Sequence, residues 1–199
     1  MSFQIETERL ILRDVQEDDI PILIKQFAEP ESRSNILSFQ ADEDHNRKDL
    51  ENAMAWAKIE RREHYKLSVV RKDDQTLIGS GTITYVRPEA FNTTIGWHYG
   101  HEFRGKGYAT EAARALLYIG FSLNDVTEIF ADCFVENKAS IKIMGKIGMS
   151  SSWNLGLFNA LRGWSYGENK PTVRYIISRN QWVAGRKSNS TIESKVFEP

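Results

Sequence analysis

The chain has little cysteine and no excess of either charge. Cys133 is the one cysteine among 199 residues, which excludes an internal disulfide and, with no Cys or His neighbour at ligand spacing, predicts no metal site. Lys and Arg number 26 against 27 acidic residues, so the net charge of −1 provides no basic field for a nucleic-acid backbone. We therefore expect no metal and no nucleic-acid partner, and we expect Cys133 to be buried as a small hydrophobe.

Long apolar runs are missing as well. No stretch approaches the roughly 18–20 apolar residues that span a bilayer. Residues 1–6 carry neither the basic region nor the apolar core of a secretory signal. With 41% hydrophobic and 27% charged residues, the composition is that of a globular protein with one core. We expect a cytoplasmic monomer or homodimer with no membrane partner, built from one domain at 1–184 and a polar, flexible tail at 185–199.

The first half of the chain mixes helix and strand patterns. Residues 9–13 are apolar in the middle and charged at both ends, which is typical of a short strand. A first helix is predicted from residue 20 to Phe27, closed by Pro30. The charged stretch 41–62 has apolar residues at spacings of three and four and predicts a second, amphipathic helix. Alternating and β-branched residues then predict three antiparallel strands, at 65–70, 76–86 and 93–99.

The second half returns to helices and strands. Residues 109–121 repeat apolar side chains at spacings of three and four, and 128–135 is typical of a central strand. Asn137 is predicted to cap a helix that runs through Lys146 and is stopped by Gly148, and two more strands are expected within 149–178. This order predicts the α/β class: a single-domain mixed, largely antiparallel sheet of about six or seven strands, with helices on both faces.

Two glycines stand where the third antiparallel strand passes into a helix. Gly105 and Gly107 allow unusual backbone angles and remove side chains that would keep an anion from the backbone N–H groups. The first helical turn adds N–H groups without internal partners, so the loop is typical of a pyrophosphate site. The spacing fits neither a nucleoside-triphosphate P-loop nor a dinucleotide fingerprint, because no Gly-Lys-Ser/Thr follows and no third glycine stands at the required position.

The segment Arg104–Ala109 resembles the acetyl-CoA-binding motif of the Gcn5-related N-acetyltransferase superfamily, Arg/Gln-x-x-Gly-x-Gly/Ala. Its continuation to Ala112 resembles the RimJ/RimL-like branch of ribosomal-protein N-terminal acetyltransferases. Other stretches resemble that branch in the same order: Thr7–Arg13, Ile95–Trp97, Asn137–Ser140 and Lys146–Met149. The resemblance covers about residues 7–182. It implies the acyl-CoA N-acyltransferase fold, acetyl-CoA as cosubstrate, and an amine acceptor on a protein N-terminus or a small molecule.

The resemblance also implies roles for individual residues. Ser140 corresponds to the residue that returns a proton to the leaving thiolate. The general base is either His98 or Glu136, unless a water chain replaces it. A strand N–H between Trp97 and Tyr99 is expected to polarise the thioester carbonyl. The expected cofactor-binding residues are Trp97, His98, Tyr99, Arg104, Gly105, Lys106, Gly107, Tyr108, Ala109, Thr110 and Asn137.

Three positions depart from the family pattern. Glu102 replaces the Arg or Gln of the motif, Thr94 stands where related strands often carry a glutamate base, and Met144 stands where many members carry a tyrosine acid. These departures keep open a module that binds acyl-CoA without turnover. A nucleotide binder of another kind and an antibiotic or polyamine acetyltransferase also remain open. We expect the acceptor cleft near loops 88–91 and 157–166, the second of which holds Phe158, Trp164 and Tyr166.

Overall fold

The computed structural model describes residues 3–35, 43–60, 62–85, 93–123, 126–152, 171–188 and 195–196. Its strands are β1 (Gln4–Glu6), β2 (Leu10–Asp14), β3 (His64–Arg71), β4 (Leu77–Thr84), β5 (Thr93–Tyr99), β6 (Glu128–Phe134), β7 (Ser150–Ser151), β8 (Thr172–Ser178) and β9 (Lys195–Val196). Its helices are α1 (Ile20–Phe27), α2 (Pro30–Asn35), α3 (Glu43–Trp56), α4 (Tyr108–Ser122), α5 (Lys138–Lys146) and α7 (Arg179–Ser188). Short 3-10 turns occur at Glu17–Asp19 and His101–Phe103.

The strands form one sheet in the order β7-β8-β6-β5-β4-β3-β2-β1-β9. All neighbouring pairs are antiparallel except β5 and β6, which run parallel. The predicted mixed, largely antiparallel α/β sheet is confirmed. It has nine strands among the described residues instead of six or seven, because the short strands β1, β7 and β9 extend its two edges.

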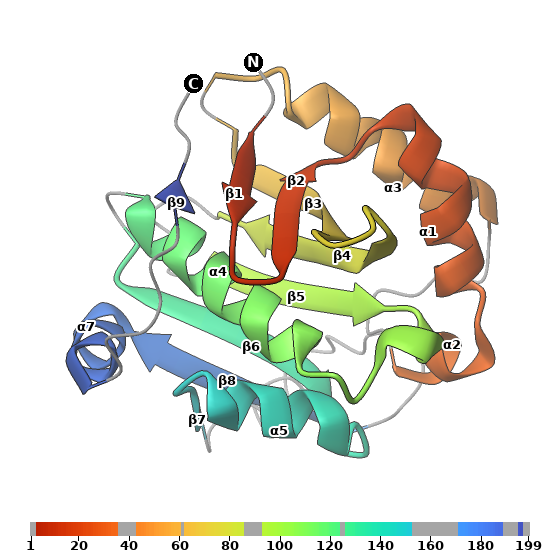
Figure 1. Ribbon diagram of the computed structural model, residues 1–199. Coiled ribbons are helices and arrows are strands. Elements are labelled where there is room, and N and C mark those ends of the chain that lie inside the picture. The colour runs from red at the N-terminus through yellow and green to blue at the C-terminus, as the bar shows by residue number, and fades with distance from the viewer. Residues whose placement is uncertain are drawn as a thin grey trace.

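Helices cover both faces of this sheet. In Figure 1, α4 crosses one face of the sheet, and α1 and α3 lie next to each other at a distance from α4. Pleating sends neighbouring side chains to opposite faces: Val69 joins the core cluster that includes α4, and Val70 joins the cluster of α1 and α3. Gly81 of β4 brings the sheet close to α4, since a Cβ there would lie 3.1 Å from Leu116. Two apolar cores therefore sandwich the central strands.

Several element boundaries differ from the prediction. Pro30 begins α2 instead of merely closing α1, which suits proline at a helix start because its missing N–H has no helical partner there. Helix α3 ends at Trp56, before the predicted limit at residue 62. Strand β1 precedes the predicted opening strand and pairs with it. Within 185–199, the structure describes the end of α7 and the two residues of β9, which pair with β1; the flexible tail expected there stays a prediction.

Other local predictions are confirmed. Asn137 caps α5 by accepting a hydrogen bond from the Ser140 N–H at 3.0 Å. Gly148 follows α5 with a φ of 88°, a left-handed angle that glycine adopts without strain. Cys133 is buried at 3% exposure in the core cluster that includes α4. Local sequence signals thus set where these elements begin and end.

Candidate functional site

Strands β5 and β6 lie side by side where they begin and then separate. Their register pairs Thr93 with Ile129 and Thr94 with Phe130, and no later pair occurs among the described residues. Beyond that point β5 stays paired with β4, and β6 stays paired with β8. A gap therefore opens between the two parallel strands toward their carboxyl ends, the edge at which open α/β sheets bind ligands.

The backbone of β5 directs N–H groups into this gap. At the end of the strand, the Gly100 N–H donates to the Ile78 carbonyl of β4 at 3.2 Å. Along an antiparallel strand, every second residue directs its backbone groups to the same side. The N–H of His98 therefore faces β4, whereas the N–H groups of Trp97 and Tyr99 face the gap. These two amides lie in the segment predicted to polarise a carbonyl.

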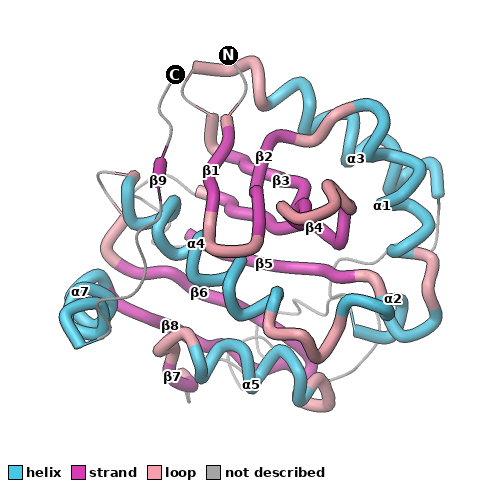
Figure 2. Tube along the Cα trace, viewed as in Figure 1, coloured by secondary structure: helices cyan, strands magenta, loops and turns pink. Residues whose placement is uncertain are grey.

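The loop from β5 to α4, drawn in Figure 2, presents a row of free backbone N–H groups. No described carbonyl accepts from the five N–H groups of residues 105–109. Gly105 and Gly107 have φ angles of 76° and 86°, which glycine alone adopts readily. A Cβ on Gly105 would meet nothing within 4 Å, so the loop is open to a ligand. Together with the positive end of the 15-residue α4, this row fits a pyrophosphate.

Arg104, predicted to bind the cofactor, directs its guanidinium toward α2. Its Nη1 donates to Glu31 Oε2 at 2.5 Å and its Nη2 donates to Ser32 Oγ at 3.0 Å. Its Nε donates to the Tyr99 carbonyl at 3.1 Å. Arg104 therefore ties the end of β5 to α2. Lys106 is exposed in the loop. Of the two cations in this segment, Lys106 is therefore the one that lies beside the free N–H groups.

Two further residues of the predicted set lie at the start of α4. Tyr108 and Ala109 supply the last two amides of the free row. The Thr110 N–H donates to the Gly107 carbonyl at 3.1 Å and is already satisfied within the first turn. Of the residues predicted from the sequence at the start of α4, Tyr108 and Ala109 thus have free N–H groups and Thr110 does not.

His98 packs on the face of the sheet that α1 and α2 cover. Its Nε2 lies 2.8 Å from Ser32 Oγ, and its ring meets Phe27 edge-on at 4.8 Å between centroids. Burial lowers the pKa of His98 to about 3, with smaller contributions from the charges of Arg104 and Lys66. The imidazole is therefore neutral across the physiological range, and it accepts a proton weakly.

The start of α5 lies at the carboxyl end of β6, on the other side of the gap. Ser140 Oγ makes no hydrogen bond to any described residue, whereas the Ser140 N–H is held by Asn137. The Ser140 hydroxyl is consequently available as a donor. Glu136 is exposed in the turn that connects β6 to α5. The structure thus brings Asn137, Ser140 and Glu136 to one edge, with β5 and its loop across the gap.

The three departures from the expected pattern take different positions. Met144 is fully buried in the core cluster that includes α4, so its side chain stabilises the fold. Thr94 forms the last residue pair between β5 and β6. Glu102 is exposed in the 3-10 turn before Arg104. Because the free N–H row does not include Glu102, the missing cation at that position leaves the row unchanged.

Sequence reasoning missed the contact between the β1–β2 turn and α4. Glu111, in the first turn of α4, accepts from Thr7 Oγ1 at 2.6 Å and from the Arg9 N–H at 2.8 Å. More than a hundred positions separate Arg9 from Glu111. A single sequence contains no signal that pairs such distant residues.

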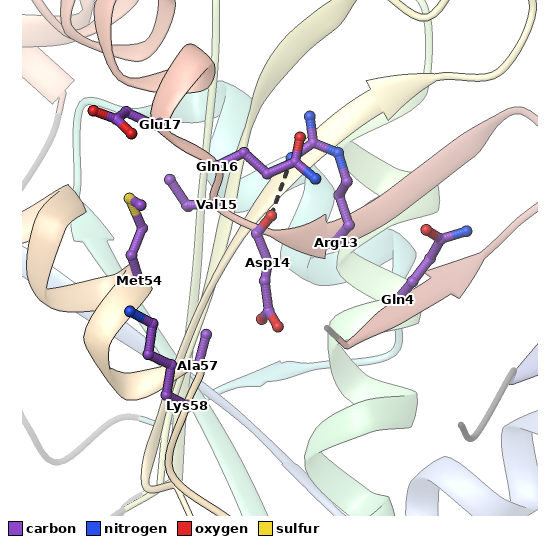
Figure 3. A pocket seen from close by; sticks show the side chains of 9 residues that line it. All are labelled: Gln4, Arg13, Asp14, Val15, Gln16, Glu17, Met54, Ala57 and Lys58. Carbon is purple, nitrogen blue, oxygen red and sulfur yellow. Dashed lines mark hydrogen bonds between the residues drawn. The ribbon is translucent and has the colours of Figure 1, made fainter. Parts of the chain in front are cut away.

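A hollow on the described surface lies away from this loop. It has a volume of about 460 Å³ and is seen close by in Figure 3. Two of the charged residues that line it are paired, Arg13 with Asp19 and Asp14 with Arg62, each at 2.6 Å. None of the predicted site residues lines it. The lining residues are Gln4, Arg13, Asp14, Val15, Gln16, Glu17, Met54, Ala57 and Lys58.

Some predicted features fall outside the description. The acceptor loops expected at 88–91 and 157–166 lie outside the described residues. Within the described part of the chain, no helix combines the length and apolar character needed to cross a membrane. The same residues contain no group of three or more His, Cys, Asp or Glu side chains placed to hold a metal ion.

Comparison with known proteins places this geometry among acetyltransferases. The model of a family described as an acetyltransferase (GNAT) domain matches residues 9–150. An uncharacterized N-acetyltransferase of Bacillus subtilis, YnaD, is 31% identical over 145 residues, which cover 73% of this chain and 81% of YnaD.

Solved structures share the fold. A GNAT-family acetyltransferase from Bacillus anthracis superimposes with a TM-score of 0.73 at 24% identity, covering 89% of this chain and 99% of that one. RimL, described as a ribosomal alpha-N-protein acetyltransferase, superimposes with a TM-score of 0.64 at 15% identity, covering 87% and 94%. At these identities the likeness shows the fold alone.

Proposed function

The chain belongs to the GNAT acetyltransferase family, and from this premise we propose that it moves the acetyl group of acetyl-CoA to a primary amine by direct attack. The observation that carries the proposal is the row of free N–H groups at residues 105–109 beside the gap between β5 and β6. The row fits the pyrophosphate, and the gap has the backbone donors that an extended amide chain needs.

The bound donor supplies a thioester carbonyl and a thiol leaving group, and residues of this chain hold and polarise it. The N–H groups of Trp97 and Tyr99 face the gap, so one of them is positioned to donate to the carbonyl oxygen. A preorganised backbone donor of this kind lowers the activation barrier of an acyl transfer by about 3 kcal/mol. Lys106 adds positive charge at the pyrophosphate end, and the Asn137 amide lies at the opposite wall of the gap.

Ser140 is our candidate for the proton donor. Its hydroxyl has no acceptor among the described residues, and it stands in the first turn of α5 at the gap. The positive end of α5 favours negative charge there, so it would stabilise the departing thiolate and the serine oxygen left after the proton transfer, which regains a proton from solvent before the next turnover. Asn137 fixes the Ser140 backbone by accepting its N–H at 3.0 Å.

The amine must lose a proton, and Glu136 is our preferred acceptor. A histidine whose pKa is about 3 removes protons from an ammonium group poorly, so we do not assign that step to His98. Glu136 is exposed and stands in contact with solvent, which carries the proton away. His98 instead packs its neutral ring against Phe27 of α1 and Ser32 of α2.

The finer proposal is that the amine belongs to a protein N-terminus. It is supported by the fold shared with RimL, a ribosomal alpha-N-protein acetyltransferase by its description. The test measures free thiol released from acetyl-CoA with peptides bearing a free N-terminus, a polyamine and an aminoglycoside. Thiol release with the peptides alone supports a protein N-terminus as the acceptor. Thiol release with the polyamine or the aminoglycoside replaces that acceptor with a small-molecule amine. If acetyl-CoA binds but no amine causes thiol release, the protein is a binding module.

Ser140→Ala tests the proton donor in the same assay, with Ser122→Ala as control because that serine lies on α4 and donates to the Tyr118 carbonyl. We expect kcat to fall about a hundredfold with unchanged acetyl-CoA affinity, since general acids typically contribute that much. A wild-type kcat in Ser140→Ala would remove Ser140 from the mechanism.

A further inference from the structure

The turn between β1 and β2 saturates the carboxylate of Glu111 on α4. Thr7 Oγ1 and the Arg9 N–H both donate to Oε1, at 2.6 and 2.8 Å. The Arg9 Nε donates to Oε2 at 2.7 Å, and Arg9 Nη2 forms an ion pair with the same oxygen at 2.7 Å. Three hydrogen bonds and this ion pair thus fix the carboxylate, and the Glu111 side chain is 16% exposed. Charge-assisted hydrogen bonds of this kind are stronger than neutral ones.

The same guanidinium contacts the loop of free N–H groups. Arg9 Nη1 donates to the Lys106 carbonyl at 3.1 Å, and the guanidinium lies over the Tyr108 ring, 4.7 Å from its centroid. A Cβ on Gly107 would lie 3.3 Å from Arg9 Nη2. Arg9 therefore touches three consecutive residues of the loop while it holds Glu111 one turn further along α4.

The contact to Lys106 has a directional consequence. The Lys106 carbonyl and the Gly107 N–H belong to one planar trans peptide unit, in which they point in opposite directions. Because Arg9 holds the carbonyl on its own side, the Gly107 N–H turns away from Arg9 and toward the open side of the loop. Arg9 thus orients one of the five free N–H groups without offering its own charge to a ligand.

The Arg9–Glu111 pair also removes an electrostatic repulsion at the start of α4. Glu111 lies in the first turn of the helix whose start would receive a pyrophosphate, and an unpaired carboxylate there repels an anion. Arg9 neutralises that charge at 2.7 Å. Without Glu111, in turn, the guanidinium would lose the hydrogen bond from Nε and the ion pair from Nη2 that hold it beside the loop.

From these contacts we infer that Arg9 and Glu111 are positioning residues for the pyrophosphate of the acetyl donor: they set the direction of the loop amides from the β1–β2 turn. The inference rests on the proposed function, since it assumes a CoA donor. It also assigns a role to the opening turn Thr7–Arg9, which the catalytic proposal does not use.

The test compares two donors that share a thioester and differ in the pyrophosphate. Acetyl-CoA carries it, and acetylated pantetheine does not. We expect Arg9→Met to weaken CoA binding, measured by calorimetry without turnover, about tenfold. The kcat/KM for acetyl-CoA should fall alike, while the value for acetylated pantetheine stays at the wild-type level. Arg47→Met is the control, because Arg47 pairs with Glu43 on the exposed surface of α3.

Two conservative variants separate positioning from charge. Arg9→Lys keeps the cation but cannot hold Glu111 and the Lys106 carbonyl together, so it should weaken CoA nearly as much as Arg9→Met. Glu111→Gln removes a negative charge near the anion site. If charge alone mattered, Glu111→Gln would tighten CoA binding, whereas loss of positioning weakens it.

The outcomes distinguish this inference from the proposed function. If the wild-type protein binds no CoA, the proposed function fails and the inference with it. The inference alone is overturned if the wild type binds CoA and both Arg9 variants bind it as tightly as the wild type. It is also overturned if both variants lose kcat/KM for acetyl-CoA and for acetylated pantetheine in the same proportion. Should Arg9→Met fail to fold, Arg9→Lys and Glu111→Gln decide by the same measurements.

Discussion

Replacement of His98 by Asn should make the stability of the protein less sensitive to acid. The unfolded chain binds a proton at this histidine below its ordinary pKa of about 6.5, whereas the folded chain, with a pKa of about 3, does not until the pH is far lower. Between these values the unfolded state binds more protons. Acid therefore destabilises the folded state in this window, and the contribution of His98 is fully present only above pH 6.5.

The size of the effect follows from linkage. A fully developed difference of one proton changes the free energy of unfolding by about 1.4 kcal/mol per pH unit. Integrated from pH 6.5 to 4.5 with these two pKa values, the His98 contribution is about 2 kcal/mol. His98 is mostly buried, so solvent screening removes little of it. Below pH 3 both states are protonated and the loss stops growing.

The assay is urea unfolding at several pH values for the wild type, His98→Asn and the control His45→Asn. His45 is exposed on α3, so its removal should leave the wild-type slope. The carboxylates titrate in all three proteins and cancel in the comparison. We expect the stability of His98→Asn to fall less steeply, by about 2 kcal/mol over this window. Parallel curves for wild type and His98→Asn would refute the burial argument for His98.

Two further predictions concern the loop and the core. Gly107→Val should abolish measurable CoA binding while the protein stays folded, because valine is strained at a φ of 86° and its Cβ would press on Arg9. Calorimetry measures the CoA affinity, and circular dichroism checks the fold. Retained affinity would contradict the amide-row argument. Cys133 should resist a thiol reagent at pH 8 until the chain is denatured, since burial, with the charge of Asp132, raises its pKa to about 12. Rapid labelling of the native protein would show that the core around Cys133 opens.

Much of the fold could be predicted because its signals are local. Strand β5, helix α4 and the capped helix α5 each follow from alternation, three-four spacing or a cap residue within a few positions. The element boundaries that were wrong depend on packing. Pro30 reads as a stop after α1, yet the same proline suits the first turn of a new helix. The residues of β9 become a strand only because β1 provides an edge to pair with.

The same difference between local signals and packing applies to the candidate site. Gly105 and Gly107 mark the loop in the sequence because the backbone conformation itself requires glycine. The roles expected of Arg104 and His98 rested on the loop motif, on the strand beside it and on residue type. In the fold, Arg104 is held by Glu31 and Ser32 of α2, and burial removes the basicity of His98.

The sequence by itself determined the class of the sheet, the position of the glycine-containing loop between β5 and α4, and the capped start of α5, since each depends on neighbours along the chain. Tertiary structure alone decided which charges are free. Arg9 and Glu111, Arg104 and Glu31, and the separation of β5 from β6 arise from residues far apart in sequence. Charge pairing, burial and strand register are properties of through-space neighbours, and the order of residues along one chain does not specify them.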